Sequence, residues 1–152
     1  MKDRLHPSSM VFVVDDEFAV RDSVRMIVQA LRISVLCYES AREFLDYVDA
    51  NEIVGPACLV ADVLMPECDG VRLLDLLRDR EWKFPAVIIS GYGGMELEQV
   101  VREFGAADYI EKPFLPGDLE RAIVANLTNQ IVRSPLVDSD PAAESPNSRK
   151  TA

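Results

Sequence analysis

Residues 10–17 read MVFVVDDE, five apolar residues followed at once by three acids. An apolar run this short and unbroken is typical of a strand that is covered on both faces of a parallel sheet. Similar runs recur along the chain, at residues 34–38, 57–61, 86–89 and 108–110. Together they predict the five strands of one parallel sheet.

The segments between these runs carry apolar residues at helical spacing. Ser40 and Glu43 form a capping box before the second segment, and Pro116 opens the last one. The five amphipathic segments are residues 20–31, 41–48, 71–77, 97–104 and 119–127. Strict alternation of strand and helix predicts an α/β fold, a doubly wound (βα)5 domain with helices on both faces of the sheet.

Composition divides the chain into three parts. With 152 residues, of which 49% are hydrophobic and 28% charged, the chain suits one globular domain. We expect this domain at residues 10–133, after an N-terminal extension at 1–9. Residues 134–152 are rich in Ser, Pro, Ala and Asp and lack helical periodicity. Such a segment buries too little apolar surface to fold, so a disordered tail or linker is expected there.

Charge and cysteine content exclude several classes of function. A net charge of −10 argues against direct nucleic-acid binding by this chain and against binding to a membrane surface. No apolar run approaches the roughly 20 residues of a membrane span, and no secretory signal is visible, so we expect a cytoplasmic protein. The three cysteines form no CxxC pair, which favours buried apolar side chains over a redox sensor.

Polar residues gather where the predicted strands end. Asp15 and Asp16 follow the first strand, Asp62 follows the third, Ser90 the fourth and Lys112 the fifth. In an open α/β sheet, ligands bind outside the carboxyl ends of the strands. Each residue alone has an ordinary structural explanation, since a strand-end Asp is commonly a helix cap. Together, in this order, they predict one functional site.

The chemistry of this cluster is coherent. Close carboxylates repel one another unless a cation lies between them, and oxygen ligands suit Mg²⁺. One carboxylate can then act as a nucleophile toward phosphorus, while a lysine ammonium neutralises the charge on the phosphoryl oxygens. We therefore expect a Mg²⁺-dependent phosphoryl-accepting site in which one of these carboxylates is the nucleophile.

Two other classes of protein fit the sequence less well. A phosphohydrolase of the haloacid-dehalogenase kind needs a second acid two residues after the nucleophilic aspartate. Two residues after Asp62, this chain has Leu64. A flavodoxin needs a phosphate-binding loop after the first strand, where the acids at 15–17 would repel a phosphate. A domain of this architecture that is never phosphorylated stays possible in principle, but every chemical position is filled.

The combined motifs resemble the receiver domains of two-component response regulators. The resemblance covers about residues 10–127, and its details are most similar to the FixJ/NarL-type subgroup. It is carried by the segments VVDDE (13–17), YESA (38–41), ADVLMP (61–66), SG (90–91) and GAADYIEKPF (105–114). The fold that the resemblance implies is flavodoxin-like, with strand order 2-1-3-4-5.

The resemblance also implies a role for each site residue. Asp62 is the expected phosphoacceptor and Lys112 the expected partner of the phosphate, in a cis bond to the following proline. Asp16 resembles the acid that contacts Mg²⁺ directly, and Asp15 the acid that acts largely through water. The backbone carbonyl of Leu64 is expected as a further metal ligand.

The same resemblance implies a conformational switch and a set of partners. Ser90 matches the switch hydroxyl and Tyr109 the switch aromatic, although periodicity alone would make Tyr109 a half-buried strand residue. The expected function is to accept a phosphoryl group from a sensor histidine kinase or phosphotransfer protein and to switch partner binding, without turnover of an external substrate. A homodimer through the fourth helix, fifth strand and fifth helix is possible. The chain is expected to be a stand-alone receiver or one cut from a longer regulator.

Overall fold

Strands and helices alternate along the whole described chain, as the sequence predicts. The computed structural model describes residues 5–91 and 94–130. The strands are β1 (Met10–Val14), β2 (Ser34–Tyr38), β3 (Ala57–Asp62), β4 (Ala86–Ser90) and β5 (Asp108–Glu111). The helices are α1 (Phe18–Ala30), α2 (Ala41–Ala50), α3 (Gly70–Asp79), α4 (Met95–Glu103) and α5 (Pro116–Thr128).

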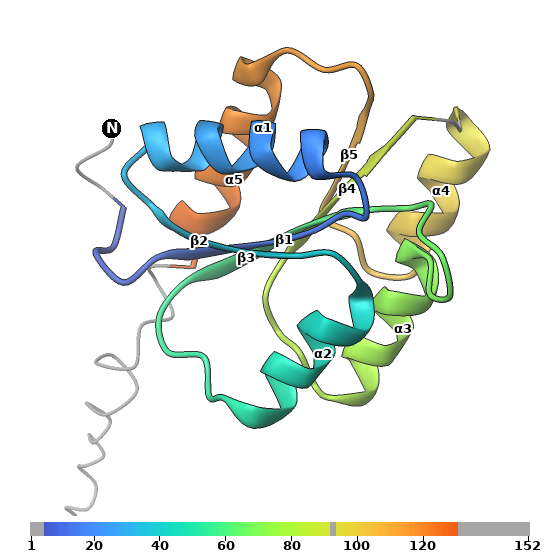
Figure 1. Cartoon of the computed structure of the whole chain (residues 1–152), viewed down its shortest axis with the longest axis horizontal. Coiled ribbons are helices and arrows are strands. Elements are labelled where there is room, and N and C mark those ends of the chain that lie inside the picture. The colour runs from blue at the N-terminus through green and yellow to red at the C-terminus, as the bar shows by residue number, and fades with distance from the viewer. Residues whose placement is uncertain (1–4, 92–93, 131–152) are drawn as a thin grey trace, which may run out of the picture.

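All five strands pair in parallel in one sheet, in the order β2-β1-β3-β4-β5 (Figure 1). The flavodoxin-like topology expected from the sequence is therefore confirmed. Asp62 pairs with Ile89 across β3 and β4, and Ser90 pairs with Glu111 across β4 and β5. The polar last residues of these strands thus reach the same edge of the sheet, which is where the predicted site lies.

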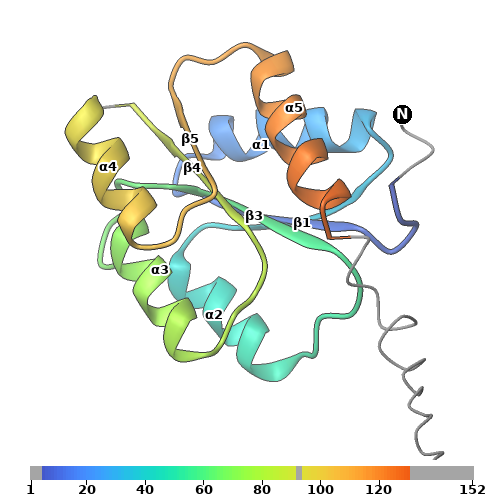
Figure 2. The same ribbon diagram turned by 180° about the vertical axis from the view of Figure 1, so that it is seen from behind.

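Helices cover both faces of the sheet, as Figures 1 and 2 show. Helices α1 and α5 pack on one face, where Val24, Val28 and Ile123 are fully buried against β1, β3 and β4. Helices α2, α3 and α4 cover the other face, where Phe44 and Leu73 are fully buried. Burial on both faces explains why the central strands are continuous apolar runs rather than alternating ones.

The starts of α2 and α3 follow local sequence signals. The Ser40 hydroxyl accepts a hydrogen bond from the Glu43 N–H at 3.2 Å, so the predicted cap is confirmed. The Glu43 carboxylate reaches the Glu39 N–H at 3.3 Å, one residue before the Ser40 N–H that a full capping box would use. Asp69 caps α3 by accepting from the Arg72 N–H at 2.8 Å.

The predicted domain limits lie near the two ends of the described chain. Part of the expected N-terminal extension is described, and Leu5 packs against the core on the α1 and α5 face. The expected disordered tail at 134–152 lies outside the described residues. Among the described helices, none combines the length and the apolar character that crossing a membrane requires.

Candidate functional site

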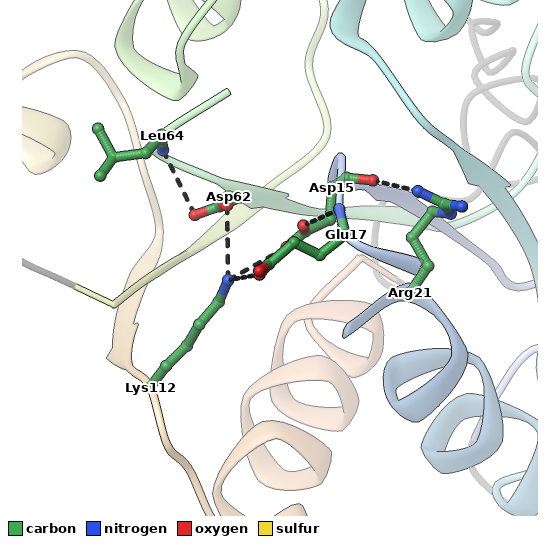
Figure 3. A network of polar contacts seen from close by, with 6 residues as sticks. All are labelled: Asp15, Glu17, Arg21, Asp62, Leu64 and Lys112. Carbon is green, nitrogen blue, oxygen red and sulfur yellow. Dashed lines mark hydrogen bonds and ion pairs between the residues drawn. The ribbon is translucent and has the colours of Figure 1, made fainter. Parts of the chain in front are cut away.

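Asp15 lies at the end of β1 with no exposed surface. Its Oδ1 accepts a hydrogen bond from the Glu17 N–H at 2.8 Å, and its backbone oxygen accepts one from Arg21 Nη1 at 2.8 Å (Figure 3). The turn between β1 and α1 is therefore tied down both by the Asp15 side chain and by a helix residue. This fixes the orientation of the Asp15 carboxylate toward the carboxyl edge of β3.

Asp62 is the last residue of β3 and is only 5% exposed. Its Oδ1 accepts a hydrogen bond from the Leu64 N–H at 3.3 Å, and the Leu64 side chain points away from Lys112 in Figure 3. The turn is close to the start of α3, because a Cβ on Gly70 would lie 2.8 Å from the Asp62 backbone oxygen. Glycine is therefore required at position 70 for α3 to begin beside the carboxylate.

The three acids Asp15, Asp16 and Asp62 each place a carboxylate oxygen within 4.8 Å of the others. Burial raises the pKa of Asp15 and of Asp62 above the ordinary value, and the backbone and Lys112 contacts offset this only in part. Asp16 is exposed at the rim of the cluster. An all-oxygen donor set whose ionised form is disfavoured by burial fits a hard divalent cation such as Mg²⁺.

Lys112 connects the acids from the side of β5. Its Nζ lies 3.3 Å from Asp15 Oδ2, 3.4 Å from Asp62 Oδ2 and 3.6 Å from Glu17 Oε1. Burial alone would lower the pKa of Lys112, but the charges of Asp15 and Asp62 outweigh it, so the pKa lies above its usual value. The ammonium is therefore charged at neutral pH. The bond from Lys112 to Pro113 is cis, as expected.

Ser90 and Tyr109 lie on the two strands that lead to this edge. Ser90 is fully buried at the end of β4, and its backbone oxygen accepts a hydrogen bond from the Lys112 N–H at 2.7 Å. Tyr109 pairs with Ile88 in the sheet and packs, half-buried, against the core on the α2, α3 and α4 face. The half-buried strand position that periodicity indicates for Tyr109 is thus what the structure shows.

The structure brings together the carboxylates and the lysine that the sequence singles out, and adds two residues to them. Sequence reasoning misses Arg21, since its contact with the Asp15 carbonyl joins residues six apart across a turn. Glu17 occupies the N-cap position of α1 without a side-chain cap bond, and its carboxylate faces Lys112.

The geometry first defines a class. A doubly wound α/β domain carries, at the carboxyl edge of its parallel sheet, one buried strand-end aspartate, two further acids and a charged lysine. The two most buried carboxylates touch the same ammonium. This arrangement is that of a domain that receives a phosphoryl group on a carboxylate.

Comparison with known proteins then gives the family. The family model described as the response regulator receiver domain matches residues 11–124. The chain belongs to this family, and a receiver domain is a signalling module rather than an enzyme that turns over an external substrate.

Individual relatives agree with this assignment. The transcriptional regulatory protein TdiR of Thauera aromatica is 37% identical over 120 residues, which cover 79% of this chain and 52% of TdiR. The transcriptional regulatory protein FixJ of Bradyrhizobium diazoefficiens is 30% identical over 135 residues, covering 89% of this chain and 60% of FixJ. The similarity to FixJ-type proteins expected from the sequence is thereby confirmed. The chain spans between half and two thirds of the length of these two curated relatives.

Solved structures show the same fold. The crystal structure titled FixJ-N superposes with a TM-score of 0.70 at 30% identity, covering 80% of this chain and 94% of that one. The response regulator StyR superposes with a TM-score of 0.78 at 27% identity, covering 95% of this chain and 72% of StyR.

Proposed function

We propose that Asp62 is the residue that accepts the phosphoryl group, and that a sensor histidine kinase or a phosphotransfer protein donates it. An Asp62 carboxylate oxygen attacks phosphorus, the new P–O bond forms as the P–N bond to the donor histidine breaks, and the imidazole leaves. The observation that carries this assignment is the 3.4 Å contact between Lys112 Nζ and Asp62 Oδ2, in an acidic cluster where Asp62 is 5% exposed.

Each neighbour of Asp62 has a task in this proposal. Asp15, Asp16, Asp62 and the backbone carbonyl of Leu64 would hold Mg²⁺. The bound cation supplies charge neutralisation at the phosphoryl oxygens. Lys112 adds a second positive charge, held beside Asp62 by its contacts with Asp15 and Glu17.

The readout proceeds through Ser90 and Tyr109. Charge added at Asp62 offers a strong acceptor to the Ser90 hydroxyl, which lies fully buried at the end of the neighbouring strand. Movement of Ser90 frees space into which Tyr109, on the next strand, rotates. The two positions therefore form a two-state element whose population follows the charge at Asp62.

A partner surface for this switch is available on α4, β5 and α5. Met95 and Val100 on α4 are exposed apolar side chains, 82% and 38% accessible. Phosphorylation-dependent homodimerisation through this face is part of the proposal.

The proposal also includes a cytoplasmic location. At its net charge of −10, this chain does not bind nucleic acid directly.

Phosphorylation by a small donor tests the assignment of Asp62. Incubation of the full chain with Mg²⁺ and acetyl phosphate should add the mass of one phosphoryl group, measured by intact-protein mass spectrometry. Asp62→Asn keeps the side-chain shape but removes the nucleophile, so this variant should gain no such mass. Asp69→Asn is the matched control, because Asp69 only caps α3. A stable phosphoryl group on the Asp62→Asn variant at the wild-type rate would contradict the assignment.

A further inference from the structure

A pocket of about 470 Å³ lies at the amino edge of the sheet, away from Asp62. It is formed where the chain enters β4 and where α5 ends. Its lining includes Trp82, Lys83, Phe84, Pro85, Asn129 and Gln130. Its volume is within the range of about 300–1,000 Å³ that is usual for binding pockets.

The walls of this pocket are held in place from within the fold. The Trp82 and Phe84 rings meet edge to face with centroids 4.9 Å apart, and Trp82 also packs against Phe44 at 5.6 Å. Elsewhere in the lining, Gln130 Oε1 accepts from the Ala57 N–H at 3.2 Å, and Gln130 Nε2 donates to the Ala57 oxygen at 2.8 Å. Trp82, Phe84 and Gln130 are therefore held in place by contacts within the fold, so filling the pocket costs little ordering of these residues.

The lining combines apolar rings with polar amide side chains and one positive charge. Trp82, Phe84 and Pro85 are only partly buried, and Lys83 between them is exposed. No carboxylate of the described residues pairs with the Lys83 ammonium. A complementary occupant is thus an apolar side chain or two, followed by an acid.

The chain itself provides such a segment next to the pocket. Gln130 lines the pocket, and the sequence continues from it as IVRSPLVDSD, so that Leu136, Val137 and Asp138 come six to eight residues later. Six extended residues reach about 20 Å, which is ample for a return to the pocket. The earlier pair, at 131–132, precedes Arg133, a charge of the same sign as Lys83.

We propose that Leu136 and Val137 occupy this pocket against Trp82 and Phe84, with the Asp138 carboxylate beside the Lys83 ammonium. The short connection to Gln130 makes the encounter intramolecular, at an effective concentration on the order of millimolar. An intrinsic affinity in the millimolar range therefore suffices for substantial occupancy. This interaction would anchor three residues of a segment whose composition otherwise predicts disorder. It does not involve the phosphorylation site.

Trp82 is the chain's single tryptophan, so its fluorescence reports on the pocket directly. In the full-length chain, Leu136→Ser/Val137→Ser should raise the acrylamide quenching constant of Trp82 about twofold, because a pocket that is about half occupied becomes empty. The matched control is Ala142→Ser/Ala143→Ser, a pair that also precedes an acid but has little apolar surface. Equal quenching constants for the two double variants would overturn the proposal.

A charge exchange tests the ionic contact separately. Lys83→Glu and Asp138→Lys should each raise the quenching constant, and the combined variant should restore the wild-type value, since the pair is then reversed. Additive effects in the combined variant would remove Asp138 from the site. A quenching constant that changes when the protein is diluted would show that the segment of a second copy fills the pocket, which contradicts the intramolecular seat.

Discussion

At the scale of single residues, the site is built from charges that are unfavourable in isolation. Asp15 and Asp62 are almost completely buried, and the carboxylate of each touches only one cation, Lys112, among the described residues. Burial makes the ionised carboxylates costly, and the contact with Lys112 relieves this cost only in part. The local stability of the fold is therefore lowered by the groups on which its chemistry depends.

This imbalance predicts a pH dependence for the metal-free protein. The pKa of Asp62 in the folded chain lies above 3.8, chiefly through burial, so its stabilising contribution is present below pH 3.8 and is lost as pH rises through the folded pKa. Asp62→Asn cannot ionise and keeps that contribution. In the presence of a chelator, the advantage of Asp62→Asn in unfolding free energy should grow as pH rises through this range.

Urea unfolding at a series of pH values measures this difference. Mg²⁺ should reduce it at neutral pH, because a cation stabilises the ionised wild-type cluster. Asp118→Asn is a suitable control, since Asp118 is a surface acid paired with Arg121. Parallel stability curves for the wild type and Asp62→Asn would show that Asp62 ionises in the fold as easily as in the unfolded chain.

At the scale of elements, close approach between β3 and α3 depends on one missing side chain. A Cβ at Gly70 would lie 2.8 Å from the Asp62 oxygen and 2.9 Å from Val63 Cα, both backbone atoms that cannot move independently. Gly70→Ala should therefore destabilise the fold by about 1–3 kcal/mol, despite the better helix propensity of alanine. It should also displace the Asp62 backbone, which amide chemical shifts would detect.

Another helical glycine serves as the control for this substitution. A Cβ at Gly117, in the first turn of α5, meets only the flexible end of Arg121, at 3.4 Å. Gly117→Ala should leave the unfolding free energy unchanged or raise it by up to about 1 kcal/mol. If both variants unfold at the same urea concentration, the contact at Gly70 does not limit the position of α3.

The switch elements should respond together to a phosphoryl mimic. Beryllofluoride bound at Asp62 should perturb amide shifts at Ser90, through α4, and at Tyr109, because Ser90 ends β4, which pairs with β3, and Tyr109 lies on β5, which pairs with β4. Ser90→Ala should confine the perturbation to the turns around Asp15 and Asp62. The proposed switch is wrong if wild-type perturbations are confined in the same way.

Elements were predictable from sequence to different degrees. The buried strands were found from their apolar runs, but Asp62, Ser90 and Glu111 still belong to strands as their polar last residues. Helix α1 starts at Phe18, two residues before its first predicted core residue. The apolar periodicity did not reveal this start, because Phe18 is 63% exposed and does not belong to the buried face of the helix. The contacts of Lys112 with Asp15 and of Gln130 with Ala57 join residues 97 and 73 apart. No local sequence pattern encodes a contact between residues so far apart in the chain. The contact of Lys112 with Asp15 was expected only because both residues follow strands of the same parallel sheet.

At the scale of the whole molecule, the Gln130 side chain ties the end of α5 to the start of β3. Its amide forms hydrogen bonds with both the N–H and the oxygen of Ala57. Ala57 is the buried first residue of β3 and precedes Leu59, where the pairing with β4 begins. Gln130→Ala would leave both backbone groups without these partners, at a cost of about 1–3 kcal/mol in unfolding free energy. Asn129→Ala, at the neighbouring exposed position, should have little effect. Equal effects of the two substitutions in urea unfolding would show that the clamp does not stabilise the fold.

Strands β1 and β3 begin at one edge of the sheet, and Asp62 lies at the opposite edge, where β3 ends. The described chain therefore has two functional poles. Ser8 lies close to Gly55, the Met10 N–H donates to the Pro56 oxygen, and Gln130 closes on Ala57, so the chain near both described ends lies at the pole opposite the carboxylates. A fluorescent reporter or a second domain fused beyond either end therefore leaves the phosphoryl-accepting pole open to a donor. Because both described ends lie at this pole, the described part of the domain is suitable for circular permutation, with a linker there and new ends in a surface loop.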